Sequence, residues 1–142
     1  MSRFARCERD TKETEIVIEL DLDGTGQYDI HTGIGFFDHM LEGFAKHGLF
    51  DLAVSVQGDT HVDAHHTVED TGIVLGQAFL KALGDKKGIA RFGYFVLPMD
   101  DALVLASLDF SGRMYFAYDC ELKAQRLGTM ETEVVKEFFM GL

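Results

Sequence analysis

The chain has 142 residues, of which 46% are hydrophobic and 26% charged, and its formal net charge is -11 at pH 7. This length suits one ordinary globular domain, and the strong negative charge argues against nucleic-acid binding, which depends on cationic side chains at phosphates. A few placed Arg side chains can still bind a small anion. No apolar run resembles a signal peptide or reaches the ~18 residues of a membrane span, so we expect a soluble, cytoplasmic protein without membrane contact.

The first residues read as strands. Residues 3–9 are a short candidate, and residues 16–23 alternate apolar and polar side chains with the period of a half-buried strand. The glycine-rich turn at 24–26 then predicts a hairpin, with its second strand over 27–32.

From Phe36 the period changes to three and four residues, which predicts a helix with one apolar face that ends at His47 and Gly48. Residues 49–56 are again strand-like. A second helix is predicted from about Thr67 to Gly84, because apolar residues recur at helical spacing between them.

The later part of the chain predicts strands over 93–96, 102–110 and 115–122, with Pro98 separating the first two. Residues 132–140 have the pattern of a helix.

Strands followed by helices indicate an α+β fold. The second series of elements repeats the opening of the first. This order predicts two similar half-domains, 1–85 and 86–142, with the second incomplete.

The densest group of chemically active side chains lies at 61–70, where three histidines and three acids occur within ten residues. On a helix, Glu69 shares a face with His65 or His66, and mixed imidazole and carboxylate ligation suits Mn, Fe or Zn. Adjacent histidines lie about 100° apart around a helix, so they serve two metals, or one metal and a supporting partner. The alternative is a solvated helix start that Asp63 caps.

Other polar residues give weaker signals on their own. His39 has core-like neighbours and reads as a structural histidine, and His47 reads as a helix-end residue. Arg91 and Arg113 stand beside glycine-flanked loops, where arginine can grip a phosphate but is more often a surface charge. Glu13 carries no signal by itself.

Taken together, these segments resemble imidazoleglycerol-phosphate dehydratases. The matching segments keep the family's order and cover nearly the whole chain; they lie at 11–14, 33–41, 61–70 with 72 and 75–78, 91–93, 98–100, 109–113, 132–133 and 137–139.

The resemblance implies a duplicated fold similar to the second domain of ribosomal protein S5. It implies homo-oligomers, with trimers that build a 24-subunit shell and active sites between subunits. It further implies a manganese-dependent lyase of histidine biosynthesis, with two Mn²⁺ per active site. Such an enzyme converts D-erythro-imidazole-glycerol phosphate to imidazole-acetol phosphate and water.

Carried over by position, the resemblance implies four metal ligands: His39, His65, His66 and Glu69. It makes Glu13 and Glu69 the catalytic carboxylates. Contacts to the substrate are implied for Glu13, His39, His47, His65, His66, Glu69, Arg91 and Arg113.

The chain departs from the family pattern in two places. Ala64 stands where the family commonly has a second acid, and no histidine follows His66, although the family carries a second His-His-x-x-Glu motif. We therefore expect a fragment whose own activity is in question. The alternatives are a different metal enzyme, such as a hydrolase, and a catalytically incomplete remnant that binds metal or assembles with family subunits.

Overall fold

The computed structural model describes residues 3–142. The chain forms two compact units, one made of the residues up to Gly84 together with Tyr118–Leu142, the other of Asp85–Ala117. The elements in chain order are β1 (Phe4–Asp10), β2 (Thr14–Asp21), β3 (Tyr28–His31), α1 (Gly35–Gly48), β4 (Asp51–Gly58), α2 (His65–Leu83), β5 (Phe92–Met99), β6 (Ala102–Asp109), β7 (Arg126–Leu127), β8 (Met130–Glu131) and α3 (Val134–Gly141).

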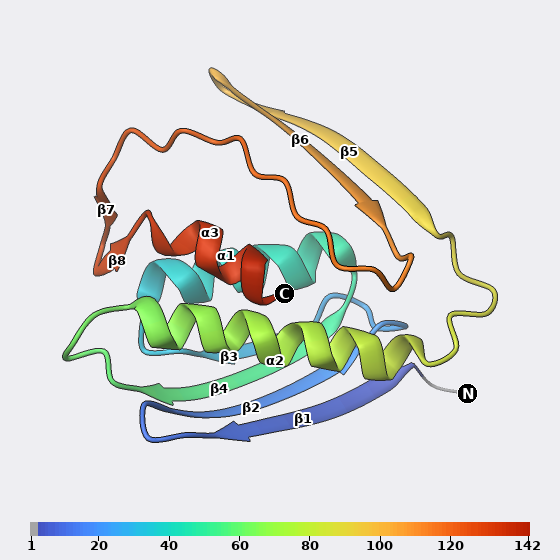
Figure 1. Ribbon diagram of the computed structural model, residues 1–142, viewed down its shortest axis with the longest axis horizontal. Helices are drawn as coiled ribbons and strands as arrows, with labels where there is room; N and C mark the ends of the chain where they lie inside the picture. The colour runs from blue at the N-terminus through green and yellow to red at the C-terminus, as the bar shows by residue number, and fades with distance from the viewer. Residues whose placement is uncertain (1–2) are drawn as a thin grey trace. The chain divides into compact units, whose positions relative to one another are not determined.

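The first unit is built on a four-stranded sheet in the order β1-β2-β4-β3 (Figure 1). β2 pairs antiparallel with β1 and β4, whereas β3 pairs parallel with β4. The predicted hairpin of 16–23 with 27–32 is therefore wrong, because β4 lies between these strands. A parallel pair needs a crossover connection, and α1 provides it between β3 and β4.

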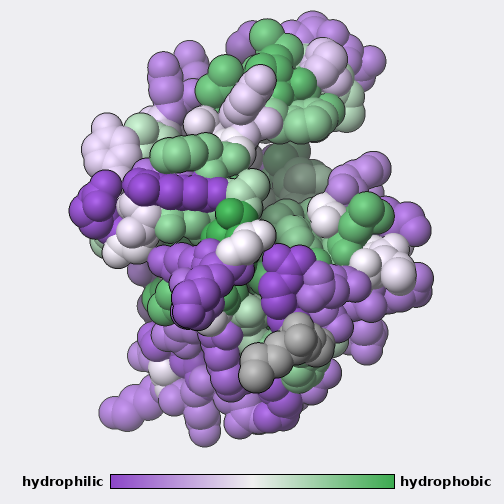
Figure 2. Space-filling view, turned by 90° about the vertical axis from the view of Figure 1, so that its right-hand side faces the viewer, coloured by the Kyte–Doolittle hydropathy of each residue, from purple (hydrophilic) through white to green (hydrophobic). Residues whose placement is uncertain are grey.

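One face of this sheet forms the core of the unit. Alternate residues of β2 and β4 point to the same side, as the two-residue period of a strand requires. The paired core residues are Ile16 with Val56, Ile18 with Val54, and Leu20 with Leu52. Helices α1 and α2 cover this face (Figure 1). The surface of this unit seen in Figure 2 is mainly hydrophilic.

Helix α3 packs on α2 at very short range. A Cβ atom added to Gly72 would lie 2.4 Å from the backbone oxygen of Phe138, and one added to Gly76 would lie 2.4 Å from that of Leu142. On the opposing helix, a Cβ at Gly141 would lie 2.8 Å from the Glu69 oxygen. The absence of side chains at these glycines lets the two backbones touch.

The second unit consists of the β5–β6 hairpin and its flanking segments. β5 runs through Pro98 to Met99, so the prediction that Pro98 separates two strands is wrong. In a two-stranded hairpin each strand has a free edge, where the missing N–H of proline costs no ladder bond. Many apolar side chains of this hairpin are exposed, and hydrophobic residues are visible there in Figure 2.

The predicted strand at 115–122 is also wrong, because these residues make no ladder with another strand among the residues described. The predicted α+β class is confirmed. The half-domains 1–85 and 86–142 stay a prediction. None of the helices within residues 3–142 combines the length and hydrophobicity needed to cross a bilayer.

Candidate metal centre

The start of α2 presents the histidine pair. Asp63 accepts a hydrogen bond from the backbone N–H of His65 at 2.8 Å, which satisfies one of the free donors of the first turn. The helix therefore begins at His65, about two residues before the predicted start at Thr67. Both His65 and His66 lie in this first turn, half-buried.

His65 forms a three-residue group with Glu69 and Glu137. Its Nε2 lies 3.1 Å from a carboxylate oxygen of Glu69, one turn further along α2. One ligand atom from each of the three residues lies within 4.8 Å of the other two. Two carboxylates and an imidazole converging in this way are a donor set that suits a divalent transition metal.

Glu137 is the member of this group that sequence reasoning missed as a ligand. It lies on α3, and the glycine contacts between α2 and α3 bring that helix onto α2. The available signal was the acid within the otherwise apolar face of Val134 and Phe138. Helical spacing alone could not reveal which helix that face would meet.

His66 turns to a different partner. Its Nδ1 lies 2.8 Å from Oδ2 of Asp59, in the loop between β4 and α2. This hydrogen bond raises the pKa of His66 above its ordinary value, partial desolvation opposes the rise, and the charges of Asp59, Glu13 and Asp63 add to it. The two histidine rings are 6.0 Å apart at an angle of 76°, so they serve separate contacts.

The backbone of Glu13 is hydrogen-bonded to Asp59, the residue whose side chain contacts His66. Its carbonyl oxygen accepts a hydrogen bond of 3.0 Å from the Asp59 N–H, and its own side chain is exposed in the loop between β1 and β2. The loop of Glu13 and the loop of Asp59 are therefore joined beside His66.

Asp70, next to Glu69, anchors α2 to the sheet. This buried carboxylate accepts a 2.5 Å hydrogen bond from the Thr14 hydroxyl and lies 3.2 Å from Nε of Arg9. The carboxylate of Asp70 is therefore engaged by Thr14 and Arg9 within the fold. Of the two adjacent acids, Glu69 is the one available to a ligand.

Two other predicted histidines lie on α1, outside the three-residue group. The side chain of His39 is 74% exposed, and its Nδ1 is 4.0 Å from Oε2 of Glu42. His47 lies exposed in the last turn of the helix. Their roles as ligand and substrate contact stay predictions.

Arg91 and Arg113 both belong to the second unit. The Arg91 guanidinium binds both carboxylate oxygens of Asp109, at 2.7 and 3.2 Å. This hydrogen bonding, with the charges of Arg91 and Arg113, holds the pKa of Asp109 below its ordinary value. Arg91 thus binds Asp109 directly at the open end of the hairpin, and the charge of Arg113 also stabilises the ionised form of this carboxylate. The substrate contacts of the two arginines stay predictions.

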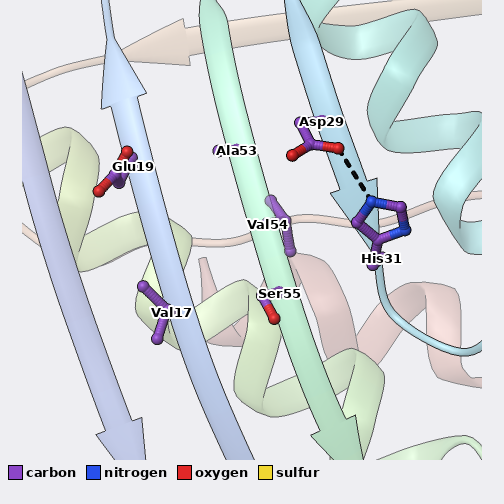
Figure 3. Close-up of a pocket in the computed structure, with 7 residues that line it drawn as sticks. All are labelled: Val17, Glu19, Asp29, His31, Ala53, Val54 and Ser55. Carbon is purple, nitrogen blue, oxygen red and sulfur yellow. Dashed lines mark hydrogen bonds and ion pairs between the residues drawn. The ribbon is translucent and has the colours of Figure 1, made fainter.

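A shallow depression lies elsewhere, on the face of the sheet away from the helices (Figure 3). His31 contacts Asp29 there at 2.9 Å, with both side chains more than three-quarters exposed. The remaining lining is strand surface, with short side chains such as Ala53 and Ser55. This depression has no convergent set of ligands comparable with that around His65.

The fold and this group define an α+β protein with a candidate histidine–carboxylate metal centre. The family model of imidazoleglycerol-phosphate dehydratase matches residues 32–142. An imidazoleglycerol-phosphate dehydratase of Caldanaerobacter subterraneus subsp. tengcongensis is 66% identical over 137 residues, covering 96% of this chain and 71% of that protein. The enzyme of the same name from Lachnoclostridium phytofermentans is 59% identical over 142 residues, covering 100% and 72%.

Solved structures agree with the sequence comparisons. The crystal structure of the dehydratase from Staphylococcus aureus matches with a TM-score of 0.83 at 36% identity, covering 96% of this chain and 76% of that one. The Pyrococcus furiosus structure matches with a TM-score of 0.79, also at 36% identity, covering 94% and 70%. This chain belongs to the imidazoleglycerol-phosphate dehydratase family, and the family's members are hydro-lyases.

Proposed function

We propose that this chain takes part in histidine biosynthesis as a manganese-dependent dehydratase, converting D-erythro-imidazole-glycerol phosphate to imidazole-acetol phosphate and water. The observation that carries the proposal is the convergence of His65, Glu69 and Glu137 in a chain of this family. His66 supports it, since it lies beside this group in the first turn of α2.

The residues present fit a divalent ion. One ligand atom of each of the three residues lies within 4.8 Å of the others, which is near enough for all three to hold one ion at ligand distances of about 2.0–2.2 Å. Two carboxylates facing each other also repel, and a cation between them removes that repulsion. We assign His65, Glu69 and Glu137 as ligands of one ion. We assign His66 and the exposed His39 as further metal ligands of the centre.

The chain's own side chains account for the proton transfers. Dehydration removes a proton from one carbon and a hydroxyl from its neighbour, and the resulting enol relaxes to the ketone. Glu13, exposed in the loop beside His66, is the proposed base that takes the proton, and its protonated form can give that proton to the departing hydroxyl, which leaves as water. When bound, the metal supplies Lewis acidity and a fixed attachment for the substrate's imidazole.

The phosphate of the substrate is assigned to the second unit. Arg91 and Arg113 offer planar guanidinium groups that match phosphate oxygens, and the carboxylate of Asp109 now occupies Arg91. A phosphate would therefore compete with Asp109 for Arg91. Active sites shared between the subunits of a homo-oligomer would account for the exposure of His39 on α1.

The test is Mn²⁺-dependent formation of imidazole-acetol phosphate by the 142-residue chain, alone and with the remaining segment of the Caldanaerobacter relative added. We expect Glu137→Gln to weaken Mn²⁺ binding by about tenfold or more, because a first ligand matters at least as much as its supporting partners. The matched control is Glu133→Gln, since Glu133 is exposed at the start of α3 and lies outside the group.

Turnover that Glu137→Gln abolishes and Glu133→Gln preserves would support the proposal. A folded chain that binds Mn²⁺ without turnover, even with the added segment, would instead identify a non-catalytic remnant. Release of inorganic phosphate without dehydration would point to a hydrolase.

A further inference from the structure

Asp59 is held firmly in the loop between β4 and α2. Its N–H donates to the Glu13 carbonyl at 3.0 Å, and its own carbonyl accepts from the N–H of Val62 at 2.8 Å. The preceding residue, Gly58, lies so close to α2 that a Cβ atom there would be 2.0 Å from Oγ1 of Thr67. The main chain around Asp59 is thus fixed both by hydrogen bonds and by packing.

The carboxylate of Asp59 is more enclosed than the ring it contacts. The Asp59 side chain is 17% exposed, whereas that of His66 is 45% exposed. Oδ1 of Asp59 is buried and accepts no hydrogen bond from the residues described, so the contact of Oδ2 with His66 is the main one that this carboxylate makes. An ordinary surface ion pair would leave both partners in water.

This contact fixes where the proton of His66 lies. An ionised carboxylate can only accept hydrogen bonds, so Nδ1 of His66 must donate across the 2.8 Å separation. A neutral imidazole carries one N–H only, and the lone pair is therefore on Nε2. A histidine binds a metal through such a lone pair, and the partner of the other nitrogen sets which one is free.

We propose that Asp59 is a positioning residue of the metal centre, which accepts a hydrogen bond from Nδ1 of His66 and so presents Nε2 to the ion. The presence of a metal ion here rests on the proposed function, whereas the orientation of His66 by Asp59 rests on the hydrogen bond between them. Because the backbone N–H of Asp59 also binds the Glu13 carbonyl, one residue connects the proposed base to a proposed ligand. A change confined to the Asp59 side chain leaves that backbone link in place.

The first measurement is the tautomer of His66 in the metal-free, ¹⁵N-labelled full chain, at a pH where the ring is neutral. Long-range ¹H–¹⁵N correlation spectra distinguish a protonated ring nitrogen from a bare one, and His66→Gln identifies the signals. We expect the Nδ1–H form in the wild type. In Asp59→Asn we expect the Nε2–H form to increase, because the amide N–H₂ can donate to Nδ1.

Asp63→Asn is the matched control. It removes the same charge from the same loop, and its side-chain oxygen can still cap the His65 N–H, but among the described residues the hydrogen-bond partner of the His66 ring is Asp59 and not Asp63. We expect its tautomer to match that of the wild type. Circular dichroism shows whether each variant folds. Even if Asp59→Asn does not fold, the ¹H–¹⁵N spectrum of the wild type still determines the tautomer of His66.

The second measurement is Mn²⁺ affinity, from the electron paramagnetic resonance of free Mn²⁺ during titration. We expect Asp59→Asn to bind about 10- to 100-fold more weakly, and Asp63→Asn to bind like the wild type. An Nε2–H form in the wild type, or unchanged affinity after the tautomer has switched, would overturn the proposal. A wild type that binds no Mn²⁺ even with the remaining segment of the Caldanaerobacter relative added, but shows the Asp59-dependent tautomer, would contradict the proposed function and leave the orientation of His66 established.

Discussion

At the scale of single residues, carboxylates have three different tasks in the first unit. Asp51 holds a turn, since its Oδ1 accepts hydrogen bonds from the backbone N–H groups of Thr25 at 2.8 Å and Gln27 at 2.9 Å. Asp70 anchors α2 through Thr14. Glu69 instead faces His65, in the group proposed to bind a cation.

Asp51 supplies a prediction about acid stability. The N–H groups of Thr25 and then Gln27 lower the pKa of Asp51 in the folded state. Its contribution to stability is therefore complete above the ordinary Asp pKa of 3.8 and is lost as the pH falls through the lower folded value. We expect Asp51→Ala to lower the urea midpoint at pH 7, and the deficit to shrink below pH 3.8.

The comparison for this variant is Glu15→Ala, which removes an exposed carboxylate from β2. Its urea midpoint should remain near that of the wild type at pH 7. An equal loss in both variants would show that net charge, and not the two hydrogen bonds to Asp51, causes the effect.

The sequence predicts the contact between His65 and Glu69, but it does not predict the partners that reach His65 and His66 from elsewhere in the chain. His65 and Glu69 are four apart on one helix, so local spacing is enough to bring them together, and the structure shows that contact. Glu137 and Asp59 reach the histidines from a different helix and from a loop. Such contacts depend on how elements pack, which a period of 3.6 residues does not encode.

At the scale of elements, the α2–α3 contact decides where Glu137 lies. Gly72 and Gly76 are four apart and share a face of α2, and that face receives the backbone of α3. Sequence periodicity predicted both helices. It did not predict the pairing of β3 with β4, because the turn at 24–26 has hairpin chemistry while the crossover through α1 overrides it.

Gly72→Ala should separate these helices. The new methyl group would meet the Phe138 carbonyl at 2.4 Å, and backbone atoms cannot move aside as a flexible side chain can. We expect a loss of about 1–3 kcal/mol in the free energy of unfolding, typical of overpacking, together with weaker Mn²⁺ binding. Urea denaturation and the Mn²⁺ titration measure the two effects.

Gly43→Ala is the corresponding change on α1, where a Cβ atom meets nothing within 4 Å. Alanine is the better helix residue by roughly 0.5–1 kcal/mol, so this variant should gain stability and keep its metal affinity. If Gly72→Ala also gained stability, the short α2–α3 contact would be refuted.

At the scale of the whole molecule, the two units differ in how they are covered. Strands β2 and β4 are interior to a sheet whose inner face is buried under helices. The β5–β6 hairpin has two strands, and all of its residues are exposed. Two-stranded hairpins without a covering layer are marginal in water, and large exposed apolar patches mark surfaces that bind a partner.

Hydrogen exchange should therefore separate the units. We expect backbone amides of β2 and β4 to exchange at the rate set by global unfolding, and those of β5 and β6 to exchange much faster through local opening. Mass spectrometry of peptides after timed labelling measures both. Equal protection of the hairpin and the central strands would mean that something covers the hairpin in solution, such as another copy of the chain.

The first unit is discontinuous in sequence, since Tyr118–Leu142 returns to it after the hairpin segment Asp85–Ala117. The chain that leads from α2 to α3 therefore leaves the first unit, passes through the second unit and returns at Tyr118, whereas the two helices touch directly at the glycine contact. A protease that cuts within 110–117 would break the chain without removing any part of the α2–α3 contact. The two pieces should then elute as one particle under native conditions and separate in denaturant. The first unit would therefore keep its fold after the peptide chain has been cut, because the packing of α3 on α2 holds the pieces together.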